Sequence, residues 1–367
     1  MPQLKIDNKE VTTAAGTTIL EAAKSLGIYI PTLCHSDQVE HYTSCMVCMV
    51  KDQVSGKFLP SCTAQAMDGM NIDTTSDEVI DLRKKAVELL LSEHRADCEA
   101  PCHLVCPAGY NIPLLNRLIT SGNFIKATAL SIDQTKNEPL WCINCPGYCQ
   151  NACRRKKVDT EISIKNLQIY ISHPENKSGN NPEAAASQPA KIPAKPPRKN
   201  KRFTSLTGKM TDNELNEWLR ECEVDNKRFS DISDNESARQ EASACMHCDC
   251  RASENCDLRE LGEKLALKNP SGKLVNSVAV KKINRKANLI FENAKCIKCG
   301  LCVRLCEDST AEPALCFINR GFVTILSEPL TNSFEDVLKS KTKECIEICP
   351  TGALSWFKTD PANEIKL

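Results

Sequence analysis

Two glycines separated by a single residue occur nowhere in this sequence, although it contains 14 glycines. The absence excludes the G-x-G-x-x-G fingerprint of dinucleotide-binding folds, and no glycine completes a G-x-x-x-x-G-K-[ST] phosphate loop. We therefore expect no NAD, FAD or ATP to be bound through those folds. A flavin or substrate site is expected on a partner.

Other residue types and patterns that are scarce in the sequence exclude further classes of function. Aromatic residues make up only 5%, and 47 basic residues balance 47 acidic ones, so nucleic acid has neither stacking platforms nor a general electrostatic footprint. The lysine-rich stretch 191–202 reads as a solvated linker. No apolar run is long enough to span a membrane, and the charged start MPQLKIDNKE lacks a signal core. These features favour a cytoplasmic protein.

Cysteine is the residue that is present in excess, with 23 copies. A cytoplasmic chain keeps its thiols reduced, so tight cysteine groups indicate metal rather than disulfides. Several thiolates on short loops are typical of iron–sulfur clusters. The sequence thus predicts several clusters and an electron-transfer role.

The chain is expected to be an α+β multi-domain protein. A hairpin turning at Asn8-Lys9 and helices over 17–26 and 77–92 form its start. Helical patterns follow at 112–118, 124–132, 212–223 and 238–267. The expected domains are a [2Fe–2S] domain at 1–75, a helical domain with two interleaved [4Fe–4S] sites at 76–173, a Pro/Lys-rich linker at 174–205, a helical four-cysteine segment at 206–270 and a ferredoxin-like domain at 271–367.

The first cysteine set suits a [2Fe–2S] cluster held by loops of a small sheet; it comprises Cys34, Cys45, Cys48 and Cys62. The stretches YIPTLCHSD, SCMVCMV and PSCTAQAMDGM resemble the N-terminal domain of the large iron–sulfur subunit of NADH:quinone oxidoreductase and of related NAD-linked hydrogenases and formate dehydrogenases. The resemblance implies a β-grasp ferredoxin fold. Zinc is the alternative metal.

The second region carries PCHLVCPAGYNIP, EPLWCINCPGYCQNACRR and EISIKNLQ. These stretches resemble the double-cluster helical domain of the glutamate synthase small subunit and dihydropyrimidine dehydrogenase. The resemblance implies one [4Fe–4S] cluster on Cys98, Cys102 and Cys153, and another on Cys106, Cys145 and Cys149.

Each of these two sets lacks a fourth ligand. His94 is the candidate for the first, and His94 with Cys98 also matches the opening of the histidine-and-three-cysteine pattern of the complex-I-type family. Gln168 is the candidate for the second, because dihydropyrimidine dehydrogenase has a glutamine ligand there. Cys142 is its rival, and a plain helix-surface role for Gln168 stays open.

A third region places four thiols within twelve residues, at Cys245, Cys248, Cys250 and Cys256. Such a group suits either a [4Fe–4S] cluster or zinc. The context of an electron-transfer chain favours iron and sulfur.

The last group follows the bacterial ferredoxin spacing, at Cys296, Cys299, Cys302 and Cys306. In such proteins the first three ligate one cluster, and its fourth ligand is a distant cysteine before proline, which is here Cys349. Only Cys345 and Cys349 remain of a second half. We therefore expect one [4Fe–4S] cluster in a bacterial-ferredoxin-like domain.

Together these motifs predict a non-catalytic electron-transfer subunit with one [2Fe–2S] and about four [4Fe–4S] clusters. The resemblance implies an NAD(P)H-oxidising flavoprotein on one side. The redox partner on the other side is a hydrogenase, a formate dehydrogenase or a ferredoxin. An electron-bifurcating complex is one option for the assembly. The alternatives are an electron-entry module of an amino-transfer or pyrimidine-type oxidoreductase, and a zinc-rich interaction protein.

Overall fold

The structure is a computed structural model and describes residues 1–94, 98–135, 142–172, 212–220, 228–252, 255–267, 281–307, 314–330, 332–338 and 340–357. Its described residues form two compact units. Unit 1 comprises Met1–Ala96 and Ala252–Ser355, and unit 2 comprises Asp97–Arg251 with Trp356–Leu367. Helix α2 (Asp77–Glu93) belongs to unit 1. The expected linker at 174–205 lies outside the described residues.

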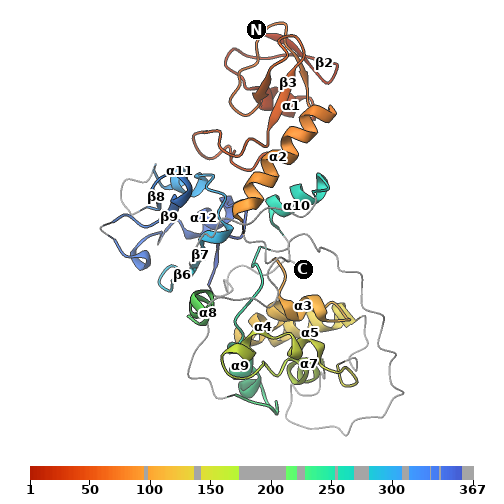
Figure 1. Cartoon of the computed structure of the whole chain (residues 1–367), viewed down its shortest axis with the longest axis vertical. Helices are drawn as coiled ribbons and strands as arrows, with labels where there is room; N and C mark the ends of the chain where they lie inside the picture. Colours follow the sequence, from red (N-terminus) through yellow and green to blue (C-terminus); the bar gives the residue numbers. More distant parts are fainter. Residues whose placement is uncertain are drawn as a thin grey trace. The chain divides into compact units, whose positions relative to one another are not determined.

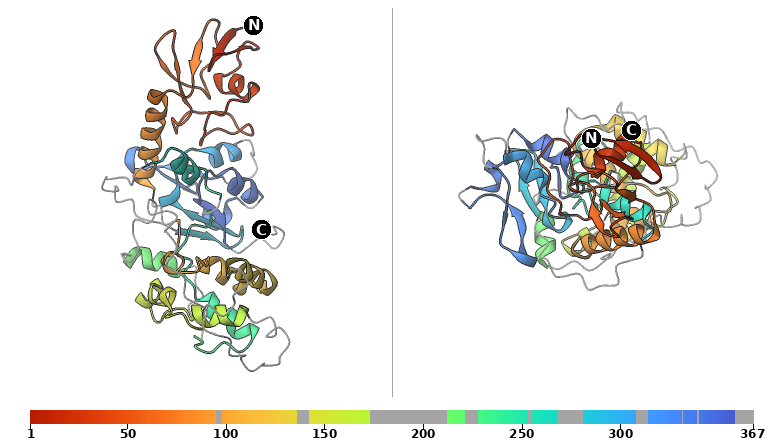
Figure 2. Two further views of the ribbon diagram at one scale, coloured as in Figure 1. Left: turned by 90° about the vertical axis from the view of Figure 1, so that its right-hand side faces the viewer. Right: turned by 90° about the horizontal axis from the view of Figure 1, so that it is seen from above.

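Unit 1 begins with a five-stranded sheet of order β2-β1-β5-β3-β4, seen at the red end of Figures 1 and 2. Its strands are β1 (Gln3–Ile6), β2 (Lys9–Thr12), β3 (Met49–Asp52), β4 (Phe58–Pro60) and β5 (Asn71–Asp73). The hairpin turns at Asp7-Asn8, one residue earlier than expected. Both residues have positive φ, which a type I′ turn requires and which Asp and Asn tolerate.

Helix α1 (Ile19–Ser25) packs its buried Ile19 and Ala23 into the core of this sheet. Thr18 starts the helix with a capping box to Glu21, and Gly27 follows its end with φ +69°. The helix expected over 17–26 is therefore confirmed.

Helix α2 confirms the helix expected after Ser76, which occupies its N-cap position. Buried Arg83 ties α2 to the sheet, because its guanidinium donates to the carbonyls of Met49 and Thr74. The helical spacing of apolar residues over 77–92 predicts that Leu89 is buried, but Leu89 is 71% exposed and Val87 is buried instead.

The rest of unit 1 contains short strands and helices. A three-stranded sheet of order β10-β7-β6 and a pair β8-β9 accompany helices α10, α11 and α12. The elements are α10 (Asp257–Lys264), β6 (Lys281–Asn284), β7 (Leu289–Glu292), α11 (Leu301–Glu307), β8 (Cys316–Ile318), β9 (Ile325–Ser327), α12 (Thr342–Ile348) and β10 (Leu354–Trp356). Three 3₁₀ turns add to them: η5 (Asn293–Lys295), η6 (Gly321–Val323) and η7 (Phe334–Asp336).

Unit 2 is helical in its described residues. Its elements are α3 (Pro101–Val105), α4 (Ile112–Thr120), α5 (Phe124–Thr135), α6 (Tyr148–Asn151), η2 (Arg154–Lys157), α7 (Ile164–Ser172), α8 (Asp212–Leu219) and α9 (Asn235–Ser243). The break between α4 and α5 lies at Ser121-Gly122 as expected, with Gly122 at φ +77°. One apolar core joins α4, α5, α7 and α9.

Candidate metal centres

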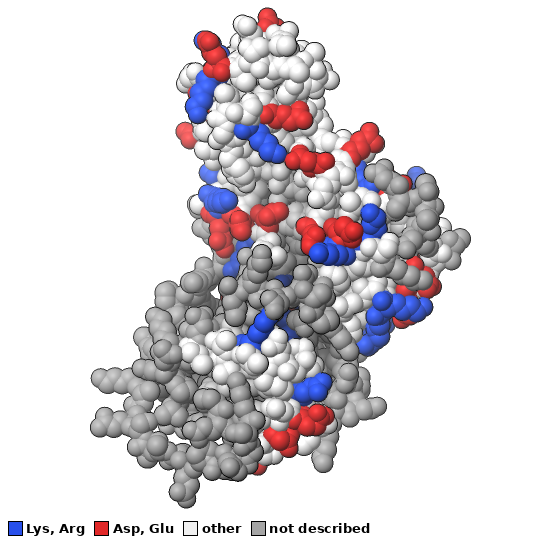
Figure 3. Space-filling view, turned by 180° about the vertical axis from the view of Figure 1, so that it is seen from behind, with Lys and Arg blue, Asp and Glu red and all other residues white. Residues whose placement is uncertain are grey.

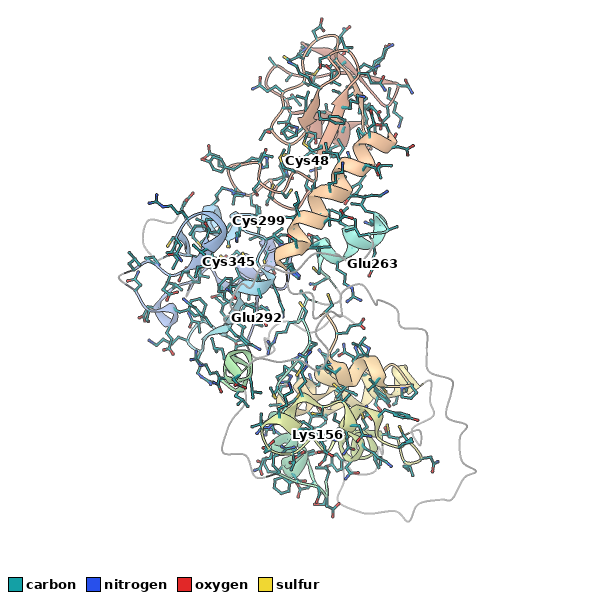
Figure 4. All side chains as sticks on the ribbon, viewed as in Figure 1. Cys48, Lys156, Glu263, Glu292, Cys299 and Cys345 are labelled. Atoms are coloured by element: carbon teal, nitrogen blue, oxygen red, sulfur yellow. The ribbon has the colours of Figure 1, made fainter. Side chains whose placement is uncertain are left out.

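The first four thiols lie on loops at one end of the N-terminal sheet and are buried. They form two pairs. The Sγ atoms of Cys48 (labelled in Figure 4) and Cys62 are 3.0 Å apart, and the backbone N–H of Cys45 donates to Cys34 Sγ at 3.5 Å. Two thiols for each of two irons is the donor set that a [2Fe–2S] cluster needs.

Hydrogen bonds stabilise negative charge within these pairs. The bond with Cys48 lowers the pKa of Cys62, and the bond with Cys45 lowers the pKa of Cys34. The Ser44 N–H and the Thr43 hydroxyl also lie against Cys34 Sγ and Cys62 Sγ, at 3.4 and 3.5 Å. Thiolates supported by donors suit binding to iron.

In unit 2, one cavity is surrounded by four thiols from the end of α3, the loop before α6, and α6 itself. They are Cys106, Cys142, Cys145 and Cys149. Gln168 on α7 lines the same cavity and is only 1% exposed. Its Oε1 accepts from Cys142 Sγ at 2.7 Å, while its Nε2 has no hydrogen-bond partner among the residues that the structure describes. Both predicted rivals for the fourth ligand thus meet at one corner.

A second cavity of unit 2 groups its thiols differently from the linear motifs. It is lined by Cys102, Cys153, Cys245 and Cys248. Buried Arg155 holds the two segments together, because it donates to the Ala244 carbonyl at 3.0 Å and pairs with Asp159. The structure therefore places Cys245 and Cys248 with Cys102 and Cys153.

The neighbouring loop holds Cys98 beside Cys250, whose backbone N–H donates to the Cys98 carbonyl at 3.2 Å. Arg117 on α4 fixes this loop with two hydrogen bonds to buried Asp249, at 2.9 and 2.7 Å. Cys98 is thus outside the Cys102/Cys153 cavity, and Cys250 is outside the Cys245/Cys248 pair.

His94 and Cys256, also expected as ligands, belong to unit 1. The His94 ring is buried, and neither ring nitrogen has a hydrogen-bond partner among the described residues. Burial lowers the pKa of His94 to about 4, so its imidazole is neutral, the form that binds metal. Cys256 is buried, with its Sγ 3.8 Å from the Pro350 carbonyl.

The third cavity, in unit 1, is lined by Cys296, Cys299, Cys302 and Cys349, the set expected from the ferredoxin spacing. Lys298 has a positive φ, and its N–H donates to Cys296 Sγ at 3.4 Å. Cys306 and Cys345 lie apart from this set and face each other, with 3.5 Å between their Sγ atoms.

The three cavities agree in size, each with a volume of about 20 Å³. Each cavity is lined by four thiols, so the three cavities resemble copies of one kind of site. Among the described residues, no three His, Cys, Asp or Glu side chains converge on a point suited to a single metal ion. The donor sets fit a multi-iron cluster, because sulfur ligands on short loops surround a space rather than a point.

Burial raises the pKa of several of these thiols and so favours their protonated form when no metal is present. It raises the pKa of Cys149, Cys296 and Cys299 to about 12 and that of Cys245 to about 11. Metal binding must then displace protons from the thiols.

Among the described residues on the face shown in Figure 3, basic and acidic side chains are interspersed and neither sign gathers in one large patch. No helix of the described residues is long and apolar enough to cross a lipid bilayer.

Comparison with known proteins agrees with these donor sets. Residues 2–77 match the family of 2Fe-2S iron-sulfur cluster binding domains, and residues 78–180 match dihydropyrimidine dehydrogenase domain II, 4Fe-4S cluster. Both resemblances expected from the motifs are confirmed over these ranges.

Two relatives are the NADPH-Fe(3+) oxidoreductase subunit alpha of Geobacter sulfurreducens and the NAD-reducing hydrogenase HoxS subunit gamma of Cupriavidus necator. The first is 34% identical over 164 residues, 44% of this chain and 19% of that protein. The second is 38% identical over 96 residues, 26% of this chain and 40% of that protein. The chain therefore spans well under two thirds of either relative.

A crystal structure of an NAD+-reducing [NiFe]-hydrogenase in the H2-reduced state has a similar fold, with a TM-score of 0.50 at 17% identity. The likeness covers 99% of this chain and 91% of the other. The chain is thus an iron–sulfur protein that joins a [2Fe–2S] domain to a [4Fe–4S] domain of the dihydropyrimidine dehydrogenase type.

Proposed function

We propose that this chain is an electron-transfer subunit of an NAD(P)-linked oxidoreductase complex. The observation that carries the proposal is the arrangement of sixteen cysteines into one doubly paired set and three four-thiol cavities. Each bound cluster accepts and donates one electron, which connects two-electron carriers to one-electron chemistry.

The residues proposed to hold the clusters follow the cavities. Cys34, Cys45, Cys48 and Cys62 hold the [2Fe–2S] cluster of a β-grasp domain. [4Fe–4S] clusters belong to three sets: Cys106/Cys142/Cys145/Cys149 with Gln168 beside them, Cys102/Cys153/Cys245/Cys248, and Cys296/Cys299/Cys302/Cys349 in a ferredoxin-like domain. His94, Cys98, Cys250 and Cys256 remain proposed ligands. The total proposed is one [2Fe–2S] and about four [4Fe–4S] clusters.

The chain's own side chains prepare these sites. Arg155 and the Arg117–Asp249 pair hold loops in which the thiols lie, so little ordering is left for binding. The backbone N–H of Cys45 donates to the sulfur of Cys34, and that of Lys298 donates to the sulfur of Cys296. Both hydrogen bonds stabilise added negative charge on these sulfurs.

The partners are proposed by analogy with the relatives. One is a flavoprotein that oxidises NAD(P)H, and the other is a hydrogenase, a formate dehydrogenase or a ferredoxin. A cytoplasmic location and the domain boundaries given above are part of the same proposal.

Anaerobic analysis of iron, acid-labile sulfide and zinc, with EPR after dithionite reduction, tests this function. We expect about 18 iron atoms per chain and signals of both cluster types. Fewer than about eight irons, or zinc in their place, contradicts the multi-cluster assignment. Bound flavin in the isolated chain would instead favour a self-contained oxidoreductase.

A further inference from the structure

One buried cation in unit 1 touches two of the proposed cluster sites. Arg304 lies on α11, between Cys302 and Cys306, and is 8% exposed. Its guanidinium donates to the carbonyl of Cys34 at 3.1 Å and to the carbonyl of Cys299 at 3.1 Å. Cys34 belongs to the [2Fe–2S] set and Cys299, labelled in Figure 4, to the third cavity.

The chain makes room for this cation. Gly300 has φ +74°, and a Cβ atom there would lie 2.9 Å from the Arg304 guanidinium. The ring of Tyr42 covers the other side, with its centroid 5.5 Å from Cζ. A side chain at position 300 would therefore displace the guanidinium from the Cys299 carbonyl.

Arginine suits the position for two reasons. Its planar fork presents separate N–H groups to two acceptors, whereas lysine presents a single ammonium. Arginine is also a cation, so it brings a positive charge to a position that contacts both cysteine sets.

Both properties bear on electron transfer. Hydrogen bonds to one residue of each set fix the spacing of the two sites. A nearby positive charge favours the added electron on either side, because Coulomb attraction is weakly screened at buried positions.

We propose that Arg304 is a positioning residue that couples the [2Fe–2S] site to the C-terminal [4Fe–4S] site, by fixing their spacing and raising both reduction potentials. This inference rests on the proposed function. It differs from a plain structural pin, which would hold the loops without acting on potentials.

The test compares the holoprotein with Arg304→Met, Arg304→Lys and a control, Arg239→Met. Arg239 is half exposed on α9 of unit 2. Iron content is measured first. EPR-monitored redox titrations then give both potentials, and relaxation of the two signals reports their spin–spin interaction.

For Arg304→Met we expect the one-electron reduction equilibrium of both sites to fall about tenfold, which is ~59 mV. For Arg304→Lys the potentials stay closer to wild type, because the charge is kept, while the spin–spin interaction weakens. The control changes neither.

Unchanged potentials in an iron-replete Arg304→Met protein overturn the inference, as does a shift at one site only. If Arg304→Met loses iron, Arg304→Lys decides, and an unaltered spin–spin interaction there overturns it. Loss of iron in both variants also overturns it, because Arg304 is then a structural pin. If the wild-type protein shows neither of the two EPR signals, the proposed function itself is contradicted. This outcome is seen before any variant is compared, so it is distinct from failure of the inference about Arg304.

Discussion

Cys142 and Gln168 line the same cavity, where Cys142 Sγ and Gln168 Oε1 are 2.7 Å apart. The cavity already has four thiols when Cys142 is counted, so the amide need not bind iron. We expect Cys142→Ala to abolish one [4Fe–4S] EPR signal and to lower the iron content by about four atoms. Gln168→Ala should keep the iron and change only the potential, because it removes a contact to the ligand sulfur.

The reverse result, with iron lost only in Gln168→Ala, would make glutamine the ligand. Cys316→Ala is the matched cysteine control, since Cys316 lies outside all three cavities.

His94 is the other residue whose role a single substitution decides. Its neutral, buried ring has two nitrogens without hydrogen-bond partners among the described residues. An imidazole held in this state is suited to binding metal. We expect His94→Ala to remove one EPR signal, with His103→Ala as the control. An unchanged spectrum removes His94 from the ligands.

Cys306 and Cys345 are cysteines that we do not propose as cluster ligands, although Cys306 continues the ferredoxin spacing. Their Sγ atoms face each other in the core, apart from the cavity of Cys296, Cys299, Cys302 and Cys349. Cys306→Ala and Cys345→Ala should therefore leave iron per chain unchanged. Cys302→Ala should lose about four irons in the same assay, which shows that the assay detects a lost site.

Among the elements, α9 depends on one buried carboxylate for its attachment to the segment before α7. Glu241 is fully buried and accepts two hydrogen bonds from Arg228 and one each from the N–H groups of Phe229 and Ser163. Burial alone would raise the pKa of Glu241, but these hydrogen bonds lower it below its ordinary value.

We expect Glu241→Ala to lower the free energy of unfolding by about 3 kcal/mol, because it removes the buried partner of Arg228 and leaves Asp159 as its remaining carboxylate partner. Since the pKa of Glu241 is lowered by folding, its contribution is present above the unfolded-state pKa and is lost as pH falls through the folded-state pKa. Denaturant unfolding at neutral and acidic pH measures both effects. Glu236→Gln, on the exposed side of the same helix, should change stability by less than about 0.5 kcal/mol at either pH.

At the level of the whole molecule, the thiol-lined cavities link metal content to stability. Each of these cavities is lined by four thiols. We expect anaerobic removal of iron with a chelator to lower the melting temperature of the protein. The protein should also take up protons, because several of the thiols have raised pKa values. Calorimetry in two buffers of different ionisation enthalpy measures both. Equal melting temperatures with and without iron would contradict the assigned role of the cavities.

Much of the fold could be predicted because it is encoded locally. The capping box at Thr18, the Gly27 stop and the Ser121-Gly122 break act over a few residues, and the structure has all three. The exposed Leu89 was not foreseeable, because the apolar pattern of α2 does not say which side meets the sheet. The compact spacing of Cys142, Cys145 and Cys149 favours Cys142 over Gln168 as the proposed fourth ligand, but spacing alone left both candidates open.

The sequence by itself determined the number of thiols, their two- and three-residue spacings, and hence the metal chemistry. Local spacing places neighbouring cysteines on one loop, and Cys296, Cys299 and Cys302, which are close in the sequence, line one cavity in the structure. Only the tertiary structure decided that Cys245 and Cys248 join Cys102 and Cys153, and that Arg304 reaches Cys34. These contacts join segments far apart in the chain, so they depend on how helices and loops pack. The spacing of neighbouring residues does not determine that packing.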